Sequence, residues 1–359
     1  MSAAGGPGPA RRRTHSRVSR PKLRYSRLPV LVGADLTTRR LAMIEARSGR
    51  DGPSVWLTAG VHGDEVGGVV VVQEIFRRLR RHPLVAGRLS AFPLLNPFGF
   101  ETASRRIPSS QEDLNRAFPG DPNGSLAQRI AHLVGERVQG DSPDLVLDLH
   151  NDWIRSIPYA LIDPRPAHAA GRAAHRRARA AAYATGLPMV DEQQEGVSRA
   201  TLRSTLSGSL LEAGVPAVTL ELGAAHSVEE SNVRDGTAAV WRALESLGVV
   251  GHEAGDPAPV LLPPGYRGLV LRYGHQPCPT GTGIVRFRVG PGDCVETGTP
   301  LATVHDVFGR RLELLRAESE AIVLGCADSA LAMPGSPVVA LAMRAAARRE
   351  SEALDRRAG

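Results

Sequence analysis

The chain has 359 residues, 42% apolar and 23% charged, which is typical of a globular protein with one large domain or two of ordinary size. No apolar run approaches the roughly 18 residues of a membrane helix, and no apolar segment follows the basic N-terminus, so we expect a cytoplasmic protein without a membrane partner. The net charge of +7 comes from arginine, and the single lysine, Lys22, excludes a Schiff-base, phosphate-loop or lipoyl-attachment lysine in the globular part.

The first segment in chain order, residues 1–27, is predicted to be a disordered basic tail. It contains Arg11, Arg12 and Arg13 together with several Pro, Ser and Gly residues, and it has few apolar side chains to bury. Such a tail could contact an acidic partner. However, an arginine excess beside abundant Ala and Gly is typical of GC-rich coding, so we expect no nucleic-acid binding.

Strands and helices alternate over residues 28–254. The predicted strands cover 29–32, 41–46, 55–57, 88–95, 144–149, 157–162 and 217–222. The predicted helices cover 66–81, 125–138, 167–185 and 228–247. This alternation indicates the α/β class, with a parallel or mixed sheet covered by helices on both faces. The segment 100–124 is rich in Pro, Ser, Asp and Gly and has no period, and a loop of that length is usually functional.

The pattern changes near the C-terminus. Residues 255–264 are rich in Pro and Gly and predict a linker, and residues 346–359 predict a charged tail. Between them, residues 265–345 contain short strand-like runs separated by turn signals, which predict a small all-β domain. This part of the chain contains three cysteines, Cys278, Cys294 and Cys326. Because they lack metal-type spacing, we expect free thiols in a reducing compartment.

A turn between the strand at 55–57 and the helix at 66–81 carries candidate metal ligands. His62 and Glu65 stand three residues apart in a glycine-flanked segment, at the carboxyl end of a strand, where open α/β sheets usually bind ligands. An imidazole and a carboxylate could hold one face of a metal ion. Taken alone, such a pair is more often an ordinary surface or hydrogen-bonded pair, so a third ligand is needed.

His150 supplies that third group, because it follows the strand at 144–149 and can approach the same sheet edge. A His-Glu-His set leaves one position of a tetrahedral zinc ion open for water, as in catalytic sites. We therefore predict one Zn²⁺ per subunit, held by His62, Glu65 and His150. Asp148 shares the strand face of His150 and either orients a ligand ring or is a structural carboxylate.

Glu221 lies at the end of the strand at 217–222, among Val, Leu and Ala, where a carboxylate is costly unless it is used or paired. At the rim of a zinc site it could accept a proton from water and pass it to a leaving amine. Considered alone, a salt-bridged glutamate is the simpler interpretation. His226, a few residues later, could line the same pocket.

The loop at 100–124 carries a second group of candidates. Arg105 could stabilise a developing oxyanion, with Arg106 as a rival for that role. Asn115 and Arg116 together could bind a carboxylate, because the guanidinium forms a two-pronged match and the amide adds donors.

In combination, these motifs resemble the succinylglutamate desuccinylase/aspartoacylase family, a branch of the zinc carboxypeptidase superfamily. The resemblance covers roughly residues 28–250, and the motifs follow the order seen in that family. The matching segments are Gly60-Val61-His62-Gly63-Asp64-Glu65, Asn96-Pro97-Phe98-Gly99, Arg105 followed by Pro108, residues 113–120 (DLNRAFPG), Asp148-Leu149-His150 and Glu221-Leu222-Gly223.

The resemblance implies a three-layer α/β/α zinc-carboxypeptidase-like domain over residues 28–254. It implies a deacylase, an amidohydrolase in which zinc-activated water removes the acyl group from a small, carboxylate-bearing N-acyl amino acid or related metabolite. The implied roles are zinc binding by His62, Glu65 and His150, general base and acid for Glu221, carbonyl polarisation by Arg105, and substrate-carboxylate binding by Asn115 and Arg116. A carboxypeptidase acting on short peptides would use the same residues, and a degenerate nucleic-acid-binding protein is a more distant alternative.

Residues 265–345 are similar to the lipoyl- or biotinyl-carrier-like extension of bacterial members of this family. Since no lysine is present there, the region cannot be a carrier. Shaping the active-site mouth, a dimer contact and plain structural packing remain open as its uses, and the oligomeric state, including a homo-oligomer, is left open as well.

Overall fold

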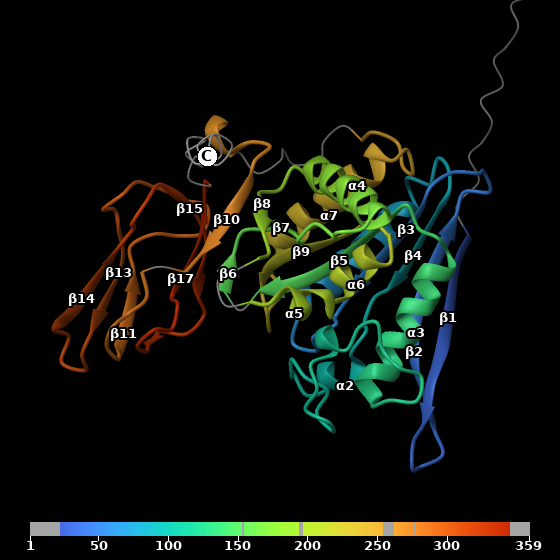
Figure 1. Ribbon diagram of the computed structural model, residues 1–359, viewed down its shortest axis with the longest axis horizontal. Helices are drawn as coiled ribbons and strands as arrows, with labels where there is room; N and C mark the ends of the chain where they lie inside the picture. The colour runs from blue at the N-terminus through green and yellow to red at the C-terminus, as the bar shows by residue number, and fades with distance from the viewer. Residues whose placement is uncertain (1–21, 153, 194–196, 254–261, 276, 345–359) are drawn as a thin grey trace, which may run out of the picture.

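The computed structural model describes residues 22–152, 154–193, 197–253, 262–275 and 277–344 (Figure 1). In the larger part of the chain the strands are β1 (Lys22–Val32), β2 (Thr38–Arg47), β3 (Ser54–Ala59), β4 (Arg88–Phe92), β5 (Leu145–Asp152), β6 (Ile154–Ser156), β7 (Tyr159–Ile162), β8 (Met189–Asp191) and β9 (Ala217–Ala224). The helices are α1 (Gly67–Leu79), α2 (Pro97–Phe100), η1 (Leu114–Arg116), α3 (Leu126–Gly140), α4 (Ala169–Thr185), α5 (Arg199–Arg203), α6 (Leu206–Glu212) and α7 (Glu230–Ser246).

The C-terminal part begins with a short 3₁₀ turn, η2 (Pro264–Tyr266), and continues as strands. They are β10 (Val270–Gly274), β11 (Gly283–Phe287), β12 (Cys294–Val295), β13 (Pro300–His305), β14 (Arg311–Arg316), β15 (Ala321–Ala327), β16 (Leu331–Ala332) and β17 (Val339–Met343). The predicted all-β character of this region is confirmed.

The large sheet has the strand order β1-β2-β4-β3-β5-β9-β7-β8-β10-β17-β15-β12, and β6 pairs with β15 beside this path. Its centre is parallel, because β3 pairs with β5 and β5 with β9 in the same direction, whereas β7 runs antiparallel to β9. Strands β3 and β5 are buried along their whole length, as expected for strands covered on both faces. The predicted mixed α/β sheet is therefore confirmed.

Helices cover both faces of this sheet (Figure 1). On one face, Gly236 of α7 packs against Leu222 of β9 and Val71 of α1, and α4 packs beside α7. On the other face, the guanidinium of Arg137 in α3 lies 5.2 Å from the ring centre of Trp56 in β3. Helix α6 also covers this second face, which carries the polar side chains described below. The layered architecture predicted from the family resemblance is thus confirmed.

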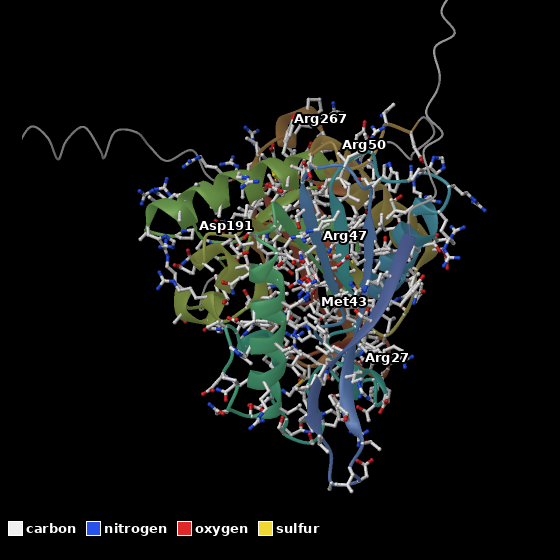
Figure 2. The ribbon with its side chains drawn as sticks, turned by 90° about the vertical axis from the view of Figure 1, so that its right-hand side faces the viewer. Arg27, Met43, Arg47, Arg50, Asp191 and Arg267 are labelled. Carbon is white, nitrogen blue, oxygen red and sulfur yellow. The ribbon has the colours of Figure 1, made fainter. Side chains whose placement is uncertain are left out.

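The N-terminal edge of the sheet corrects one prediction. Residues 22–27 were expected in the disordered tail, but they belong to β1, which pairs with β2 from Lys22 opposite Arg47 onward. The side chains of Leu23, Leu28 and Val30 pack against the core, and the basic side chains of this segment lie between these apolar positions. Figure 2 shows this edge, where Arg27 on β1 and Arg47 on β2 are labelled. Residues 1–21, the rest of the predicted tail, lie outside the described residues.

The C-terminal strands are joined to the main sheet by hydrogen bonds. Strand β10 runs parallel to β8, with Val270 opposite Met189, and β6 pairs with β15. A second sheet, β14-β13-β11-β16, packs over a separate small apolar cluster. Most of the predicted linker and the whole predicted tail, 346–359, lie outside the described residues, so the domain boundaries remain predictions.

Two further observations concern the described residues. None of their helices combines the length and apolar character needed to cross a membrane. Cys278, Cys294 and Cys326 form no disulfide among the described residues, as expected from their spacing.

Candidate active site

The turn between β3 and α1 places His62 and Glu65 inside the protein. Gly60, directly after β3, has a φ of +59°, which a glycine adopts without strain. Gly63 packs so closely on the backbone of Gly99 that an added Cβ would lie 2.0 Å from its carbonyl carbon. The turn is therefore held against the start of the long loop, and His62 and Glu65 are 2% and 3% exposed.

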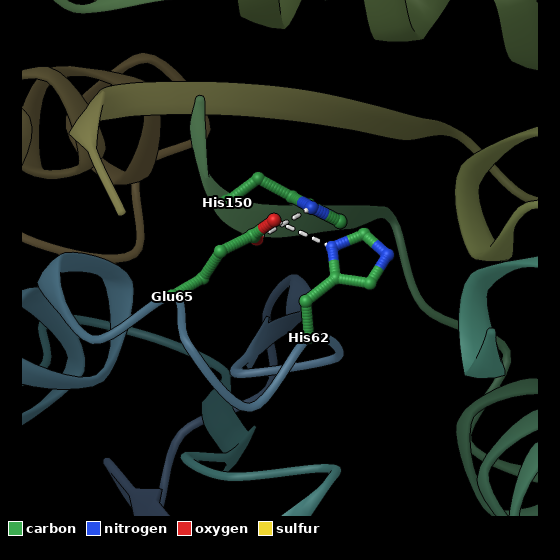
Figure 3. Close-up of side chains that lie close together, drawn as sticks. All are labelled: His62, Glu65 and His150. Carbon is green, nitrogen blue, oxygen red and sulfur yellow. Dashed lines mark hydrogen bonds and ion pairs between the residues drawn. The ribbon is translucent and has the colours of Figure 1, made fainter. Parts of the chain in front are cut away.

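His62, Glu65 and His150 converge on one point (Figure 3). Nδ1 of His62 lies 2.5 Å from Oε1 of Glu65, and Nδ1 of His150 lies 3.0 Å from Oε2 of the same carboxylate. One potential ligand atom from each residue lies within 4.8 Å of the other two. All three side chains are buried, so the predicted His-Glu-His set is brought together in space.

The outward-facing nitrogens of both imidazoles also have carboxylate partners. Nε2 of His62 lies 3.1 Å from Oδ1 of Asp113, and Nε2 of His150 lies 3.0 Å from Oδ2 of Asp148. Asp148 in turn accepts a 2.7 Å hydrogen bond from Thr58 Oγ1. Metal-ligating histidines usually donate their second ring N–H in this way, which fixes the ring and its tautomer. The donor set and its supports therefore fit a zinc ion.

Opposite charges in this cluster shift the pKa values of its members. Burial acts against ionisation of Glu65, yet the His62 and His150 rings hold the pKa of this carboxyl below its usual range. Burial likewise opposes protonation of His150, but the carboxylates of Asp148 and Glu65 raise its pKa well above the ordinary value.

Glu221 stands next to this cluster on the neighbouring strand. It is paired in register with His150 across β5 and β9, and with Tyr159 across β9 and β7. Among the described residues, its Oε2 atom is buried and has no hydrogen-bond partner. Burial raises the pKa of Glu221 well above the usual value for a glutamate. A carboxyl group in this state can accept and release a proton at the rim of the site.

Arg105, and not its rival Arg106, reaches the cluster. Its Nη1 lies 3.4 Å from Glu65 Oε1 and its Nη2 lies 3.3 Å from Asp113 Oδ2, while the side chain is 47% exposed. Arg106 instead donates a hydrogen bond to the backbone oxygen of Gln111. The Arg105 guanidinium is thus tethered between the cluster and solvent.

Asn115 and Arg116 lie in the short turn η1. Oδ1 of Asn115 accepts a 2.9 Å hydrogen bond from the backbone N–H of Leu206, which leaves its amide nitrogen as the group that could donate to a ligand. Arg116 Nη1 donates to the backbone oxygen of Asn115 at 2.8 Å. Helix α6 therefore braces the residues that were predicted to bind a carboxylate.

All seven predicted site residues line one cavity of about 730 Å³. His226 lines it as well, as the sequence suggested. The C-terminal region supplies part of the wall, through Ala327, Asp328, Ser329, Leu331, Met333, Ser336 and Pro337. Of the three uses left open for this region, this lining favours a part in shaping the cavity.

Sequence reasoning missed several polar residues of this cavity. They are Asp152, Tyr159, Glu192 and Thr219. Glu192 follows β8, which has only three residues and so leaves a weak pattern in the sequence. Thr219 lies inside β9, and only the pairing of β9 with its neighbours decides which face of the sheet this side chain occupies. Asp163 directly follows the predicted strand at 157–162. A polar residue at the carboxyl end of a strand is often near a ligand site, so this position could have marked Asp163 as a candidate.

Comparison with known proteins is consistent with this geometry. A model of the succinylglutamate desuccinylase/aspartoacylase catalytic domain matches residues 51–247, more than half of the chain. A curated relative, N-alpha-acetyl-L-2,4-diaminobutyric acid deacetylase of Halomonas elongata, is 39% identical over 112 residues. That match spans 31% of this chain and only 32% of the relative.

Solved structures match over nearly the whole length. A succinylglutamate desuccinylase/aspartoacylase from Rhodobacter sphaeroides is 26% identical with a TM-score of 0.70, covering 90% of this chain and 96% of that one. A product-bound ectoine utilization protein from Ruegeria pomeroyi is 22% identical with a TM-score of 0.71, covering 92% and 98%. The second likeness shows the shared fold.

Proposed function

Because the chain belongs to the succinylglutamate desuccinylase/aspartoacylase family, we propose that it is a zinc-dependent amidohydrolase. In this proposal it removes the acyl group from a small N-acyl amino acid or related metabolite. The observation that carries the proposal is the buried His62-Glu65-His150 cluster with the unpartnered carboxyl of Glu221 beside it in one cavity. The name of the Halomonas elongata relative, a deacetylase of an amino acid, supports deacylation over peptide cleavage.

The metal would be held by the ring nitrogens of His62 and His150 that face Glu65, together with the carboxylate of Glu65. When bound, zinc supplies a Lewis acid that activates water for attack on an amide carbonyl. Asp113 and Asp148 fix the two imidazole rings from behind, so the ligand atoms are positioned before the metal arrives.

Proton transfer falls to Glu221. Its Oε2 accepts the proton that the attacking water loses and then gives that proton to the nitrogen of the departing amine. The surroundings that raise the pKa of Glu221 favour uptake of the proton, because a carboxyl with a raised pKa binds a proton more readily. The C–N bond breaks as this nitrogen is protonated, which yields a carboxylic acid and a free amine.

Arg105 and the η1 turn act on the substrate. The guanidinium of Arg105 reaches the cavity and would bind the carbonyl oxygen as negative charge develops there. The amide nitrogen of Asn115 and the guanidinium of Arg116 would bind a substrate carboxylate. The hydrogen bond from the backbone N–H of Leu206 to Oδ1 of Asn115 fixes the orientation of the Asn115 amide. Less side-chain entropy is therefore lost when its NH₂ group donates to a substrate.

The test is hydrolysis of acetyl, succinyl and formyl amino acids, beside short peptides, by the zinc-loaded protein. We expect at least one N-acyl amino acid to be cleaved, and we expect Glu221→Gln to lower kcat by roughly 100- to 10,000-fold at unchanged zinc content. Glu74→Gln, on α1 where the carboxylate pairs with Arg77 outside the cavity, is the matched control. Full activity of the Glu221 variant would remove it from the mechanism, and cleavage of peptides alone would overturn the deacylase assignment.

A further inference from the structure

We propose that Asn151 is a positioning residue, which fixes the candidate metal ligands relative to the candidate proton acceptor. Its backbone and side chain form hydrogen bonds to three separate places: the carboxylate of Glu65, the start of helix α1, and strand β9 next to Glu221. This inference rests on the proposed function and adds a residue to it. In this role Asn151 neither binds the metal nor transfers a proton.

The backbone of Asn151 holds one oxygen of the Glu65 carboxylate. The N–H of Asn151 donates a 3.1 Å hydrogen bond to Oε2 of Glu65, the oxygen that also lies 3.0 Å from Nδ1 of His150. Strands β5 and β9 are paired in register up to His150, and the register shifts between His150 and Asp152. Irregular pairing of this kind re-aims groups next to active sites. Two consecutive residues of β5 therefore contact the same carboxylate oxygen.

The side chain of Asn151 caps helix α1 from a neighbouring strand. Helix α1 begins at Gly67, and Val66 at the N-cap position forms no side-chain capping hydrogen bond. Oδ1 of Asn151 instead accepts a 3.1 Å hydrogen bond from the N–H of Gly68, in the first helical turn. An N–H group at this position has no partner within its own helix. The start of α1, two residues after Glu65, is thereby attached to β5.

The amide nitrogen of the same side chain reaches strand β9. Nδ2 of Asn151 donates a 3.2 Å hydrogen bond to the backbone oxygen of Leu222, the residue directly after Glu221. The next residue, Gly223, has a φ of +98°, which is far from the extended values of a strand. Regular pairing with β5 therefore does not continue here. The Asn151 side chain joins the two strands immediately beyond the row that contains His150 and Glu221.

The Asn151 amide has a single orientation that satisfies both of its partners. A reversed amide would place its NH₂ group against the N–H of Gly68 and its oxygen against the oxygen of Leu222, so neither bond would form. Asn151 is 4% exposed. A Cβ added at Gly67 would lie 2.5 Å from Nδ2 of Asn151, and its three nearest atoms all belong to this side chain. The position of the amide is thus determined by contacts on every bonded side.

The first test is the zinc affinity of Asn151→Ala, measured by competition titration against a chelator, which requires no turnover. The variant keeps the backbone N–H that bonds Glu65 but loses both side-chain bonds that align it. We expect zinc affinity to fall by roughly 10- to 100-fold, the usual effect of losing an outer partner of a metal ligand. At saturating zinc, kcat for an N-acyl amino acid should fall by a factor of the same order, whereas KM should stay close to the wild-type value.

A stability control separates positioning from general destabilisation. Leu79 is fully buried at the other end of α1 and does not line the cavity. Leu79→Ala should lower the melting temperature of the zinc-free protein at least as much as Asn151→Ala does, because it leaves a cavity in the core. Its zinc affinity should nevertheless equal that of the wild type. A loss of affinity in Leu79→Ala equal to that in Asn151→Ala would overturn the proposal.

Gly67→Ala tests the same amide from the opposite side. Its methyl group would displace the side chain of Asn151, so zinc affinity should fall as it does in Asn151→Ala. In the double variant the methyl group has no amide to displace. We therefore expect the two losses not to add, as for residues in direct contact. Fully additive losses would overturn the proposal.

The outcomes distinguish this proposal from the proposed function. Wild-type zinc affinity in a folded Asn151→Ala variant overturns the positioning role and leaves the deacylase in place. If Asn151→Ala does not fold, Gly67→Ala decides in its place, and wild-type affinity there has the same meaning. If the wild type cleaves no N-acyl amino acid, the proposed function fails, and the zinc titrations still decide whether Asn151 positions the ligands.

Discussion

His150 and Glu221 are direct neighbours across the parallel strands β5 and β9, so a candidate metal ligand and the candidate proton acceptor share one row of the sheet. Tyr159 continues this row on β7. Side chains in such a row keep their spacing through backbone hydrogen bonds and do not depend on loop conformation. The chemistry proposed for the site therefore needs little reorganisation before reaction.

Replacement of a direct ligand should abolish tight zinc binding. We expect His150→Ala to weaken zinc affinity by more than roughly 100-fold, because even outer carboxylate partners account for 10- to 100-fold in such sites. The measurement is metal content after dialysis, together with a competition titration against a chelator. His226→Ala is the matched control, since His226 lines the same cavity but is 61% exposed. Equal zinc content in both variants would contradict the ligand assignment.

Asp148→Asn should weaken metal binding without unfolding the protein. The substitution keeps the shape of the side chain and its contact with Thr58, but it removes the charge that orients His150. We expect a loss of zinc affinity of about 10- to 100-fold, read from the same chelator titration. Asp235→Asn on α7, where the carboxylate pairs with Arg234, controls for the loss of a charge. An affinity equal to that of the wild type would assign Asp148 a purely structural role.

Gly68→Ala should destabilise the protein at the contact between α1 and β5. A Cβ at this position would lie 2.7 Å from the backbone oxygen of Leu149, so helix and strand must separate. We expect a loss of about 1–3 kcal/mol, seen as a melting temperature lower by roughly 2–10 °C. Gly140→Ala, at the open end of α3, has no atom within 4 Å of the new methyl group and should be neutral or slightly stabilising. Similar melting temperatures for the two variants would show that α1 adapts without cost.

Asp163 should make stability fall as the pH rises. Burial raises its pKa from 3.8 to about 6 in the folded protein. The folded state therefore holds this proton more tightly, and the stabilisation that exists below pH 4 is lost as the pH rises through 6. Asp163→Asn cannot titrate, so its free energy of unfolding relative to wild type should rise by up to about 3 kcal/mol between pH 4 and 7. Urea denaturation at both pH values measures this difference, and parallel pH profiles would contradict it.

Local sequence was sufficient for several parts of the structure. The alternation of apolar runs predicted the α/β class, and the change of pattern near residue 255 predicted the all-β region. The motif around His62 and Glu65 predicted a compact turn, and Gly60 in it has a positive φ that other residues rarely adopt. These features depend on residues that are close together in the chain, so the local sequence pattern is sufficient to predict them.

Tertiary structure decided the rest. The sequence could not show that residues 22–27 pair as a strand, because their alternation is short and basic side chains surround it. It could not show that β10 continues the sheet from β8, since strand pairing across distant segments leaves no local pattern. The closeness of Asp163 and Glu192 likewise depends on the pairing of two separate strands, β7 and β8. Sequence alone thus determined which groups are candidates for the chemistry, and long-range strand pairing determined which of these groups face the same cavity.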